Sequence, residues 1–486
     1  MTPKRYVQSD FFVQGVARRG PVHWRRSLLS VLVAAAVSGC TTMPPKELVL
    51  PQAPVPAVWS TSASGSAPGL SGQTPASLAQ WWQRFNDLQL TTLVEQALRA
   101  NTSIRSAQSA LLQSRALRDV KTAGMLPGVS GAASAQRSQA NGNPATNSLR
   151  AGLDASWEPD VFGGKRSALG ATQADAQAAE ASLADVQVTV AAEVALAYIQ
   201  LRGQQTQLVI AASNLASQQE TLQITDWRAQ AGLTTSLEVE QVRTATAQTS
   251  AQLPALEASI ATTRHSLAVL TGQSPDALQA LMGTGQAVPQ VAEHLALAIP
   301  VQTLRQRPDV RAAEHRISAA LARVSVADAA RYPGFSISGS VGLNALTLAG
   351  LTNGASVVNA LLGSVSIPLL DGGAAKAQVR AQEAALEQAR IAYQSVVLTA
   401  LKDVEDALVA LKGDRARLIH LEGAATAAGN AALLAQQRYV SGLIDFQTVL
   451  QTQRTLMTAQ DSVASARADI STDHVRLYKA LGGGWL

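Results

Sequence analysis

Six histidines, one cysteine and a Gly-Gly-Lys-Arg-Ser segment are the residues of this 486-residue chain that could do chemistry. The histidines do not have the spacing of metal ligands; they are His23, His265, His294, His315, His420 and His474. No G-x-S-x-G sequence supports a serine nucleophile, and the segment from Gly163 to Ser167 lacks the G-x-x-x-x-G-K-[ST] frame of a phosphate loop. We therefore expect no enzyme, no metal site and no cofactor.

Cys40, the only cysteine, offers acylation instead. Arg25-Arg26 precede an apolar run over 28–37, which is too short to span a bilayer and is typical of an export signal. The run ends in Val-Ser-Gly before Cys40, which resembles a bacterial lipobox, where the thiol is diacylated, the chain is cut before it and the new amine is acylated. We expect 1–39 to be a lipoprotein signal peptide and Cys40 the lipidation site, since several acyl chains anchor firmly. An ordinary signal peptide with an incidental cysteine is the alternative.

The basic net charge belongs to this leader. Residues 1–39 hold six of the 39 Lys/Arg and one of the 34 Asp/Glu, which leaves 39 − 6 = 33 basic and 34 − 1 = 33 acidic residues. A neutral mature chain gives no polybasic surface, so we expect no nucleic-acid partner. Aromatic residues at 4% and charged residues at 15% are typical of long, weakly charged helices.

The second half of the chain repeats the first about 206 residues later. The matching segments are Leu98–Arg105 with Leu304–Arg311, Pro127–Ser130 with Pro333–Ser336, Gly163-Gly164 with Gly372-Gly373, and Gly232 with Gly442. A unit used twice usually supplies halves of a quasi-symmetric assembly. The expected divisions are a lipid-anchored, flexible segment over 40–75, a first repeat over 76–272, a linker over 273–300 and a second repeat over 301–486.

Each repeat contains two amphipathic strands, expected at about 128–137 and 148–157 and at about 335–344 and 359–367. In the second of these, Leu149 and Leu153 alternate with Arg150 and Asp154, which gives one apolar and one polar face. Strands of about ten residues are long enough to cross a membrane at a tilt. A soluble sheet with one face in water is the alternative.

Long helices follow each strand pair. From Gly164 to Ala231 there is no proline, and apolar residues recur every seven positions, as in coiled coils. A helix of that length reaches about 100 Å. We expect sharp bends between strand and helix at Gly163, Gly164, Gly372 and Gly373, where a backbone without Cβ turns easily. Gly232 and Gly442 are expected to end the long helices in tight turns, from which shorter helices return.

Two strand pairs cannot close a barrel within one chain. An open sheet edge in lipid would leave backbone groups unpaired, at a cost of about several kcal/mol each. The chain must therefore oligomerise through its strands. Eight strands would be filled by side chains, whereas twelve begin to leave a lumen.

The chain resembles the outer membrane factors, the TolC-like ducts of efflux and type I secretion, and in particular the NodT-type lipoproteins. The residues that carry the resemblance are Trp81–Asp87, Arg307–Glu314, Ile367–Gly373, Arg438–Leu443, Val449–Leu456 and Tyr478–Gly483. The resemblance implies a mixed α/β membrane protein, namely a homotrimer with a twelve-stranded outer-membrane β-barrel, four strands per chain, continued by a long periplasmic α-helical coiled-coil barrel. It also implies a location in the outer membrane of a Gram-negative bacterium, to which Thr41 after the cysteine would sort the protein. The implied partners are a periplasmic adaptor and an inner-membrane pump.

The resemblance places the turns at Gly232 and Gly442 at the periplasmic tip, where the pore would close. An Asp is common in the family nine residues past the second glycine, but Gln451 stands there in this chain. We expect Glu238 and Asp445 to give a negative, cation-selective tip, with Glu240 as a further acid. A solvated helix face is the alternative.

The leading functional hypothesis is a passive exit duct that carries drugs and small toxic compounds across the outer membrane. The alternatives are an exit duct for type I protein secretion and a structural coiled-coil lipoprotein of the envelope.

Overall fold

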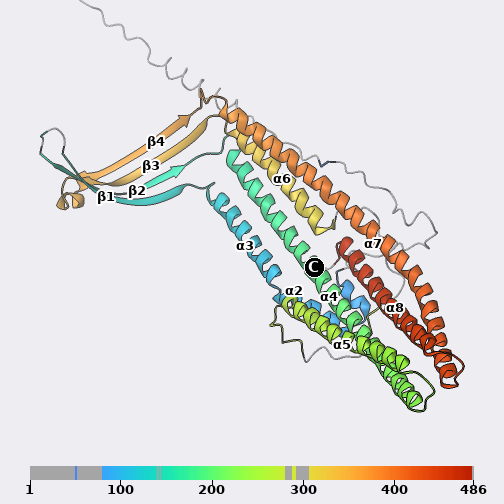
Figure 1. Ribbon diagram of the computed structural model, residues 1–486. Helices are drawn as coiled ribbons and strands as arrows, with labels where there is room; N and C mark the ends of the chain where they lie inside the picture. Colours follow the sequence, from blue (N-terminus) through green and yellow to red (C-terminus); the bar gives the residue numbers. More distant parts are fainter. Residues whose placement is uncertain are drawn as a thin grey trace, which may run out of the picture.

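A computed structural model of the chain describes residues 50–51, 79–139, 142, 144–279, 287–291 and 306–483. Cys40 and the predicted signal peptide over 1–39 lie outside these residues. Within them the chain is elongated, with a sheet at one end and long helices running away from it (Figure 1).

The sheet is antiparallel throughout, in the order β1-β2-β3-β4. The strands are β1 (Gly128–Ser138), β2 (Thr146–Trp157), β3 (Gly334–Ala345) and β4 (Val357–Ser366). The two repeats join where β2 pairs with β3, and there Gly152 lies opposite Gly342. A Cβ on Gly152 would lie 2.8 Å from the carbonyl oxygen of Val341, so this close approach of the two strands requires glycine.

The helices come in pairs of equal length, one from each repeat. The pairs are α3 (Thr102–Ala123) and α6 (Pro308–Ala329) with 22 residues, α4 (Gly164–Gln230) and α7 (Ala374–Val440) with 67, and α5 (Ser236–Leu270) and α8 (Phe446–Ala480) with 35. The starts of α3 and α6 differ by 308 − 102 = 206, and those of α4 and α7 by 374 − 164 = 210. The additional four residues match the longer loop between β3 and β4, which spans 346–356 against 139–145 in the first repeat and includes the short 3-10 helices η5 (Ala349–Thr352) and η6 (Gly354–Ser356).

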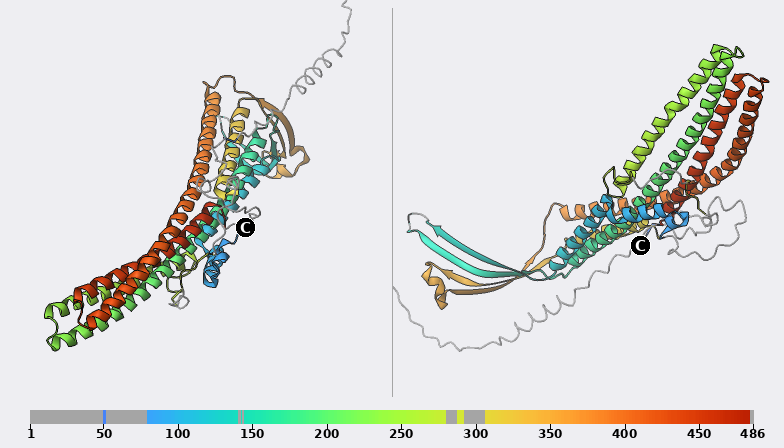
Figure 2. Two further views of the ribbon diagram at one scale, coloured as in Figure 1. Left: turned by 90° about the vertical axis from the view of Figure 1, so that its right-hand side faces the viewer. Right: turned by 90° about the horizontal axis from the view of Figure 1, so that it is seen from below.

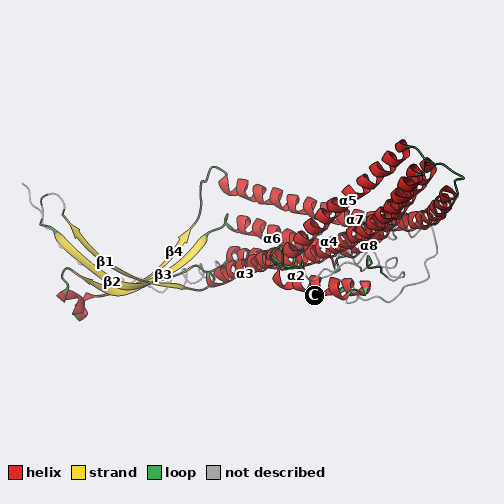
Figure 3. Cartoon of the chain, turned by 60° about the horizontal axis from the view of Figure 1, so that its bottom comes forward, coloured by secondary structure: helices red, strands yellow, loops and turns green. Residues whose placement is uncertain are grey.

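The helices form a layer and two hairpins. Below the sheet, α3, α4, α6 and α7 lie side by side in that order (Figure 1). Farther from the sheet, α5 returns along α4 and α8 returns along α7, so that two hairpins reach the far end of the molecule together (Figure 2). Figure 3 shows the strands gathered at one end of the molecule and the long helices at the other, with only the short 3-10 helices η5 and η6 beside the strands.

A buried cluster marks the middle of the molecule, where η3 (Trp81–Phe85) and α2 (Leu88–Ala100) join the long helices. Trp81 stacks on Tyr478 of α8 with ring centroids 5.4 Å apart. Arg202 of α4 is fully buried, and its Nε donates to the Tyr198 hydroxyl at 3.0 Å. That hydroxyl donates in turn to Asp87 at 2.7 Å, so the buried charge is paired through a hydrogen-bonded network.

Among the residues that the structure describes, one helix is long and apolar enough to cross a membrane, by length and composition alone. This is α4, and 44% of its most apolar 18-residue window is buried in the protein. The residues of α4 from Val190 to Leu201 supply a large part of the central cluster. We attribute the apolar stretch to packing against η3, α2 and α5 rather than to contact with lipid.

Candidate functional site: sheet faces and helical tips

The sheet has an uncovered apolar face. In the register of the four strands, Leu153 of β2 lies opposite Val341 of β3, and Trp157 opposite Ile337. The exposed large apolar side chains on this face are Val129, Leu153, Trp157, Ile337, Val341, Val357, Leu361 and Val365. Monomeric soluble proteins rarely expose such a continuous patch, whereas the outer face of a membrane barrel requires one.

The opposite face of the sheet is mostly polar. Arg150 and Asp154 of β2 point to this side and form an ion pair of 3.4 Å, with both side chains about half exposed. On β3 and β4, the hydroxyls of Ser336 and Ser364 are 2.7 Å apart. Val358 and Leu362 of β4 are exposed apolar side chains on the same face. A lining of hydroxyl groups and a neutral ion pair suits a water-filled lumen.

The two edges of the sheet require strands from other chains. Within the described part of one chain, β1 pairs only with β2, and β4 pairs only with β3. Every residue of β1 and β4 is exposed. Backbone N–H and C=O groups cannot remain unpaired in lipid, so the edges must close against neighbouring subunits.

Sharp bends join the strands to the long helices. Gly163, Gly372 and Gly373 have φ of +77°, +63° and +88°, a backbone region that favours glycine. Gly164, which the sequence also suggested as a bend, is instead the first residue of α4. A Cβ on Gly164 would lie 3.2 Å from the Cβ of Ala329, so this glycine serves a close approach of α4 and α6 rather than a turn.

Carboxylates cap the helices at both bends. Partial burial would raise the pKa of Asp160, but hydrogen bonds from the backbone N–H groups of Arg166 and Lys165 outweigh it and hold the pKa below its usual value. Backbone N–H groups of Ala375 and Gly373 lower the pKa of Asp371 in the same way. Both carboxylates are stabilised at a helix N-terminus, where unpaired N–H groups favour negative charge.

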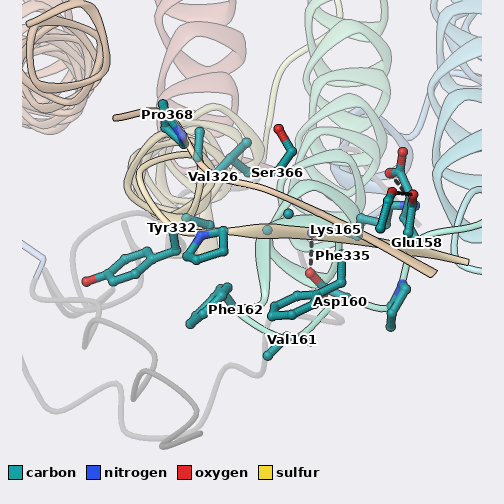
Figure 4. Close-up of a pocket in the computed structure, with 18 residues that line it drawn as sticks. Glu158, Asp160, Val161, Phe162, Lys165, Val326, Tyr332, Phe335, Ser366 and Pro368 are labelled. Atoms are coloured by element: carbon teal, nitrogen blue, oxygen red, sulfur yellow. Dashed lines mark hydrogen bonds and ion pairs between the residues drawn. The ribbon is translucent and has the colours of Figure 1, made fainter. Parts of the chain in front are cut away.

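An open pocket of about 620 Å³ lies at the first bend, between the ends of the sheet and the start of α4 (Figure 4). Aromatic side chains gather on one side, where Phe162 stacks on Tyr332 at 4.9 Å and on Phe335 at 6.4 Å. Nearby, the indole of Trp157 donates to the carbonyl of Met125 at 3.1 Å. Aromatic residues at this level match the girdle that membrane barrels carry at the interface.

The predicted tip turns share one geometry. Gly232 and Gly442 have φ of +72° and +71°. The N–H of Leu233 donates to the carbonyl of Arg228 at 2.8 Å, and the N–H of Leu443 to the carbonyl of Arg438 at 2.9 Å. This bonding closes each long helix in a Schellman motif, which requires a left-handed residue, usually glycine.

The two tips are tied together by a contact that the sequence did not reveal. Arg228 at the end of α4 donates from Nη1 to the backbone carbonyl of Tyr439 at the end of α7, at 2.5 Å. Its guanidinium also lies 4.5 Å from the centroid of the Tyr439 ring. The Tyr439 ring packs edge-on against Phe446 of α8 at 5.8 Å. The pairing of Arg228 with Tyr439 therefore holds one hairpin against the other.

The four candidate gate residues have different surroundings. Glu238 is half-buried in the first turn of α5. Glu240 is exposed and paired with Arg243 at 2.5 Å. Asp445 is the N-cap of α8, and hydrogen bonds from the side chain and the backbone N–H of Thr448 hold its pKa below the usual value. Gln451 is exposed on α8. Asp445 therefore caps α8, a structural role that the sequence alone did not distinguish from a role at the gate.

Known proteins that are similar to this chain share the architecture described above. The sequence profile described as "Outer membrane efflux protein" matches residues 93–273 and again 299–483. "Nodulation protein T" of Rhizobium leguminosarum is 28% identical over 94% of this chain and 93% of its own length. "Pyoverdine export outer membrane protein OpmQ" of Pseudomonas putida is 32% identical over 95% and 98%. The solved outer-membrane channel OprN superposes with a TM-score of 0.82 at 35% identity, over 90% of this chain and 99% of that one. The chain therefore belongs to the outer membrane efflux protein family.

Proposed function

We propose that small toxic compounds are the cargo of this duct. The chain is the outer-membrane exit duct of a tripartite efflux system and works as a homotrimer with a periplasmic adaptor and an inner-membrane pump. It is a channel and not an enzyme. Relatives at 29% identity are named for the efflux of toluene and of solvents, which supports a cargo of small apolar compounds.

The lumen face of the sheet is the observation that carries this proposal. On the described strands it presents hydroxyl groups, one Arg150–Asp154 pair per chain, whose charges cancel, and the apolar side chains of Val358 and Leu362 on β4. Such a lining neither concentrates nor repels ions of one sign strongly. It would let cargo pass by diffusion in water, with the choice of cargo made by the pump.

A deletion strain tests the cargo. Loss of the gene should raise sensitivity to a panel of antibiotics, dyes and solvents, and a plasmid copy should restore resistance. Unchanged sensitivity together with loss of one polypeptide from the culture medium would contradict the proposal and favour type I secretion. Unchanged sensitivity with a leaky envelope would favour a structural lipoprotein.

We also propose that Cys40 anchors the mature chain in the outer membrane. The sequence before it has the order of a lipoprotein signal, and a relative at 29% identity is named outer membrane protein OprJ. In cells grown with labelled palmitate, the wild-type protein should carry the label and the Cys40→Ser variant should not. A labelled Cys40→Ser protein would contradict the assignment.

A third proposal concerns the acids at the tips. Glu238 is half-buried near the tip turn, so its charge is screened less by salt than a fully exposed one. In planar bilayers, Glu238→Gln should lower the preference of the trimer for cations over anions. The matched control is Glu240→Gln with Arg243→Gln, which removes a paired acid and base together and leaves the net charge of the tip unchanged. Equal selectivity in the two variants would refute the role of Glu238.

A further inference from the structure

The pocket at the first bend has a polar side and an aromatic side. It encloses about 620 Å³, a volume typical of pockets that hold small molecules. Figure 4 shows Glu158 on one side of the pocket, and Phe162 and Tyr332 on the other. A pocket divided in this way suits an amphiphile, a molecule with one polar and one apolar end.

The polar side carries a complete ion pair. Glu158 follows β2 and Lys165 lies in the first turn of α4, and the Oε2 of Glu158 is 3.1 Å from the Nζ of Lys165. The two side chains are 65% and 34% exposed, so a ligand can reach both charges. The Nζ of Lys165 also donates to the carbonyl of Gly124 at 3.3 Å, which holds the ammonium in place. The polar side therefore presents one negative and one positive group next to each other.

The remaining charges between β2 and α4 are already balanced. Asp160 accepts hydrogen bonds from the backbone N–H groups of Lys165 and Arg166, and it lies 3.2 Å from the guanidinium of Arg166. The protein's own carboxylate thus occupies the helix N-terminus, which would otherwise attract an anion. Residues 158–166 hold two acids and two bases, so their formal charges cancel. A zwitterion finds a partner for each of its charges there, whereas an anion would be repelled by Glu158.

The aromatic side of the pocket lies toward lipid. Phe335 belongs to the apolar face of the sheet, because it lies opposite Val365 and two residues before Ile337. Phe162 stacks on Phe335 and on Tyr332, and Tyr332 is 36% exposed. In membrane proteins such rings lie at the level of the lipid headgroups. The rings therefore offer an apolar surface to the glycerol and the upper acyl chain of a lipid.

The position of the pocket allows lipid to enter. Most of its walls come from α4, α6, the start of β3 and the connection between β2 and α4. These elements lie in the middle of the sheet and of the helix layer (Figure 1), away from the outer strands that meet neighbouring subunits. The strands cross the outer membrane and the helices continue into the periplasm, so the bend lies at the headgroups of the inner leaflet.

We propose that this pocket binds one membrane phospholipid per subunit, with a zwitterionic headgroup of the phosphatidylethanolamine type. The lipid ammonium donates to Glu158, the lipid phosphate accepts from Lys165, and the glycerol and upper acyl chain lie against Phe162 and Tyr332. The four charges then alternate in sign, and both contacts are charge-assisted hydrogen bonds. The bound lipid fixes the depth of the bend in the membrane. The proposal does not depend on the cargo of the duct.

Lipid uptake by the purified trimer tests the headgroup. Trimer freed of lipid in detergent is titrated with phosphatidylethanolamine and followed by native mass spectrometry. It should take up three molecules, and at a lower concentration than it takes up phosphatidylglycerol or phosphatidylcholine. The first of these competitors is anionic, and the second has no N–H donors on its headgroup. Equal uptake of the three lipids by the wild-type trimer would overturn the proposal.

Single variants test the placement of each part of the lipid. Glu158→Gln leaves Lys165 unbalanced, so the preference should turn from phosphatidylethanolamine to phosphatidylglycerol. Lys165→Gln should weaken the binding of both lipids, by about two- to fivefold for a contact as exposed as this one. Phe162→Ala should weaken all three lipids by a similar factor. The matched control is Glu95→Gln on α2, which removes the acid of another exposed pair and should change nothing.

A Glu158→Gln trimer that keeps the preference of the wild type would contradict the placement of the headgroup. The comparison of the three lipids on the wild-type trimer decides the proposal even where Phe162→Ala fails to assemble.

The acyl groups expected on Cys40 are the other candidate occupant. They are covalent, so they stay on the chain when collisions in the mass spectrometer release bound lipid. If they filled the pocket, the wild-type trimer would take up no phosphatidylethanolamine, whereas Cys40→Ser would take up three molecules. That result would overturn the proposal in favour of the protein's own anchor. Equal uptake by the wild type and Cys40→Ser would support a membrane lipid.

Discussion

Two adjacent leucines of β4 allow a direct test of which sheet face meets lipid. Leu361 lies on the apolar face, opposite Gly339, and Leu362 on the polar face, opposite Ser338. Both are exposed in the single chain, at 82% and 61%. We expect Leu361→Arg to abolish assembly in the outer membrane and Leu362→Arg to be tolerated, because only the first places its charge in lipid.

The magnitude follows from the position of Leu361 near the middle of β4. Arginine on the lipid face of a barrel costs about 2–4 kcal/mol at the bilayer midplane and about 0–1 kcal/mol near the interfaces. The trimer has three copies, so the full cost is about 6–12 kcal/mol, comparable to the whole stability of a typical protein domain. Leu362→Arg places the same side chain in water and should cost little.

The assay is the amount of heat-modifiable trimer in outer-membrane fractions, with total protein measured on denaturing gels. Leu361→Ala is the matched control for loss of the side chain without a charge, and it should assemble. Equal loss of trimer in Leu361→Arg and Leu362→Arg would refute the assignment of faces. Loss in Leu362→Arg alone would invert it.

Three further predictions concern the tips, the middle of the molecule and the sheet. Arg228→Ala breaks the contact with the second hairpin and should raise the open-channel conductance. The control Arg243→Ala breaks only an exposed ion pair and should leave the conductance unchanged. Equal conductance in the two variants would contradict the role of Arg228. Burial raises the pKa of Asp473 to about 6 and lowers that of His474 to about 4. Between about pH 4 and 6 the ionisation of Asp473 therefore lowers stability as pH rises, while the loss of the proton from His474 raises it. The melting temperature of the trimer should rise with pH in Asp473→Asn and fall in His474→Gln, and parallel curves would refute this opposition. Gly152→Val should reduce trimer yield, because its Cβ would lie 2.8 Å from a backbone oxygen of β3; an unchanged yield would contradict the close approach.

The sequence predicts the elements that depend on local pattern. The alternation of Leu149 and Leu153 with Arg150 and Asp154 is a property of one strand, and β2 contains it. Gly232 and Gly442 break two uninterrupted helical runs, and each adopts the left-handed backbone there. These features needed no knowledge of distant contacts, because the period of the pattern and the glycine were sufficient.

The tip contact depends on distant residues and could not be predicted in this way. Arg228 and Tyr439 are separated by 439 − 228 = 211 residues and meet only because α4 and α7 have the same length. In the sequence, Tyr439 stands out only as part of a family motif, and Arg228 belongs to no motif. For Asp445 the residue could be predicted but not its role, since a carboxylate before a helix is consistent both with a cap and with a gate residue. Its bonds to Thr448 show that it caps α8, and its role at the gate stays a prediction.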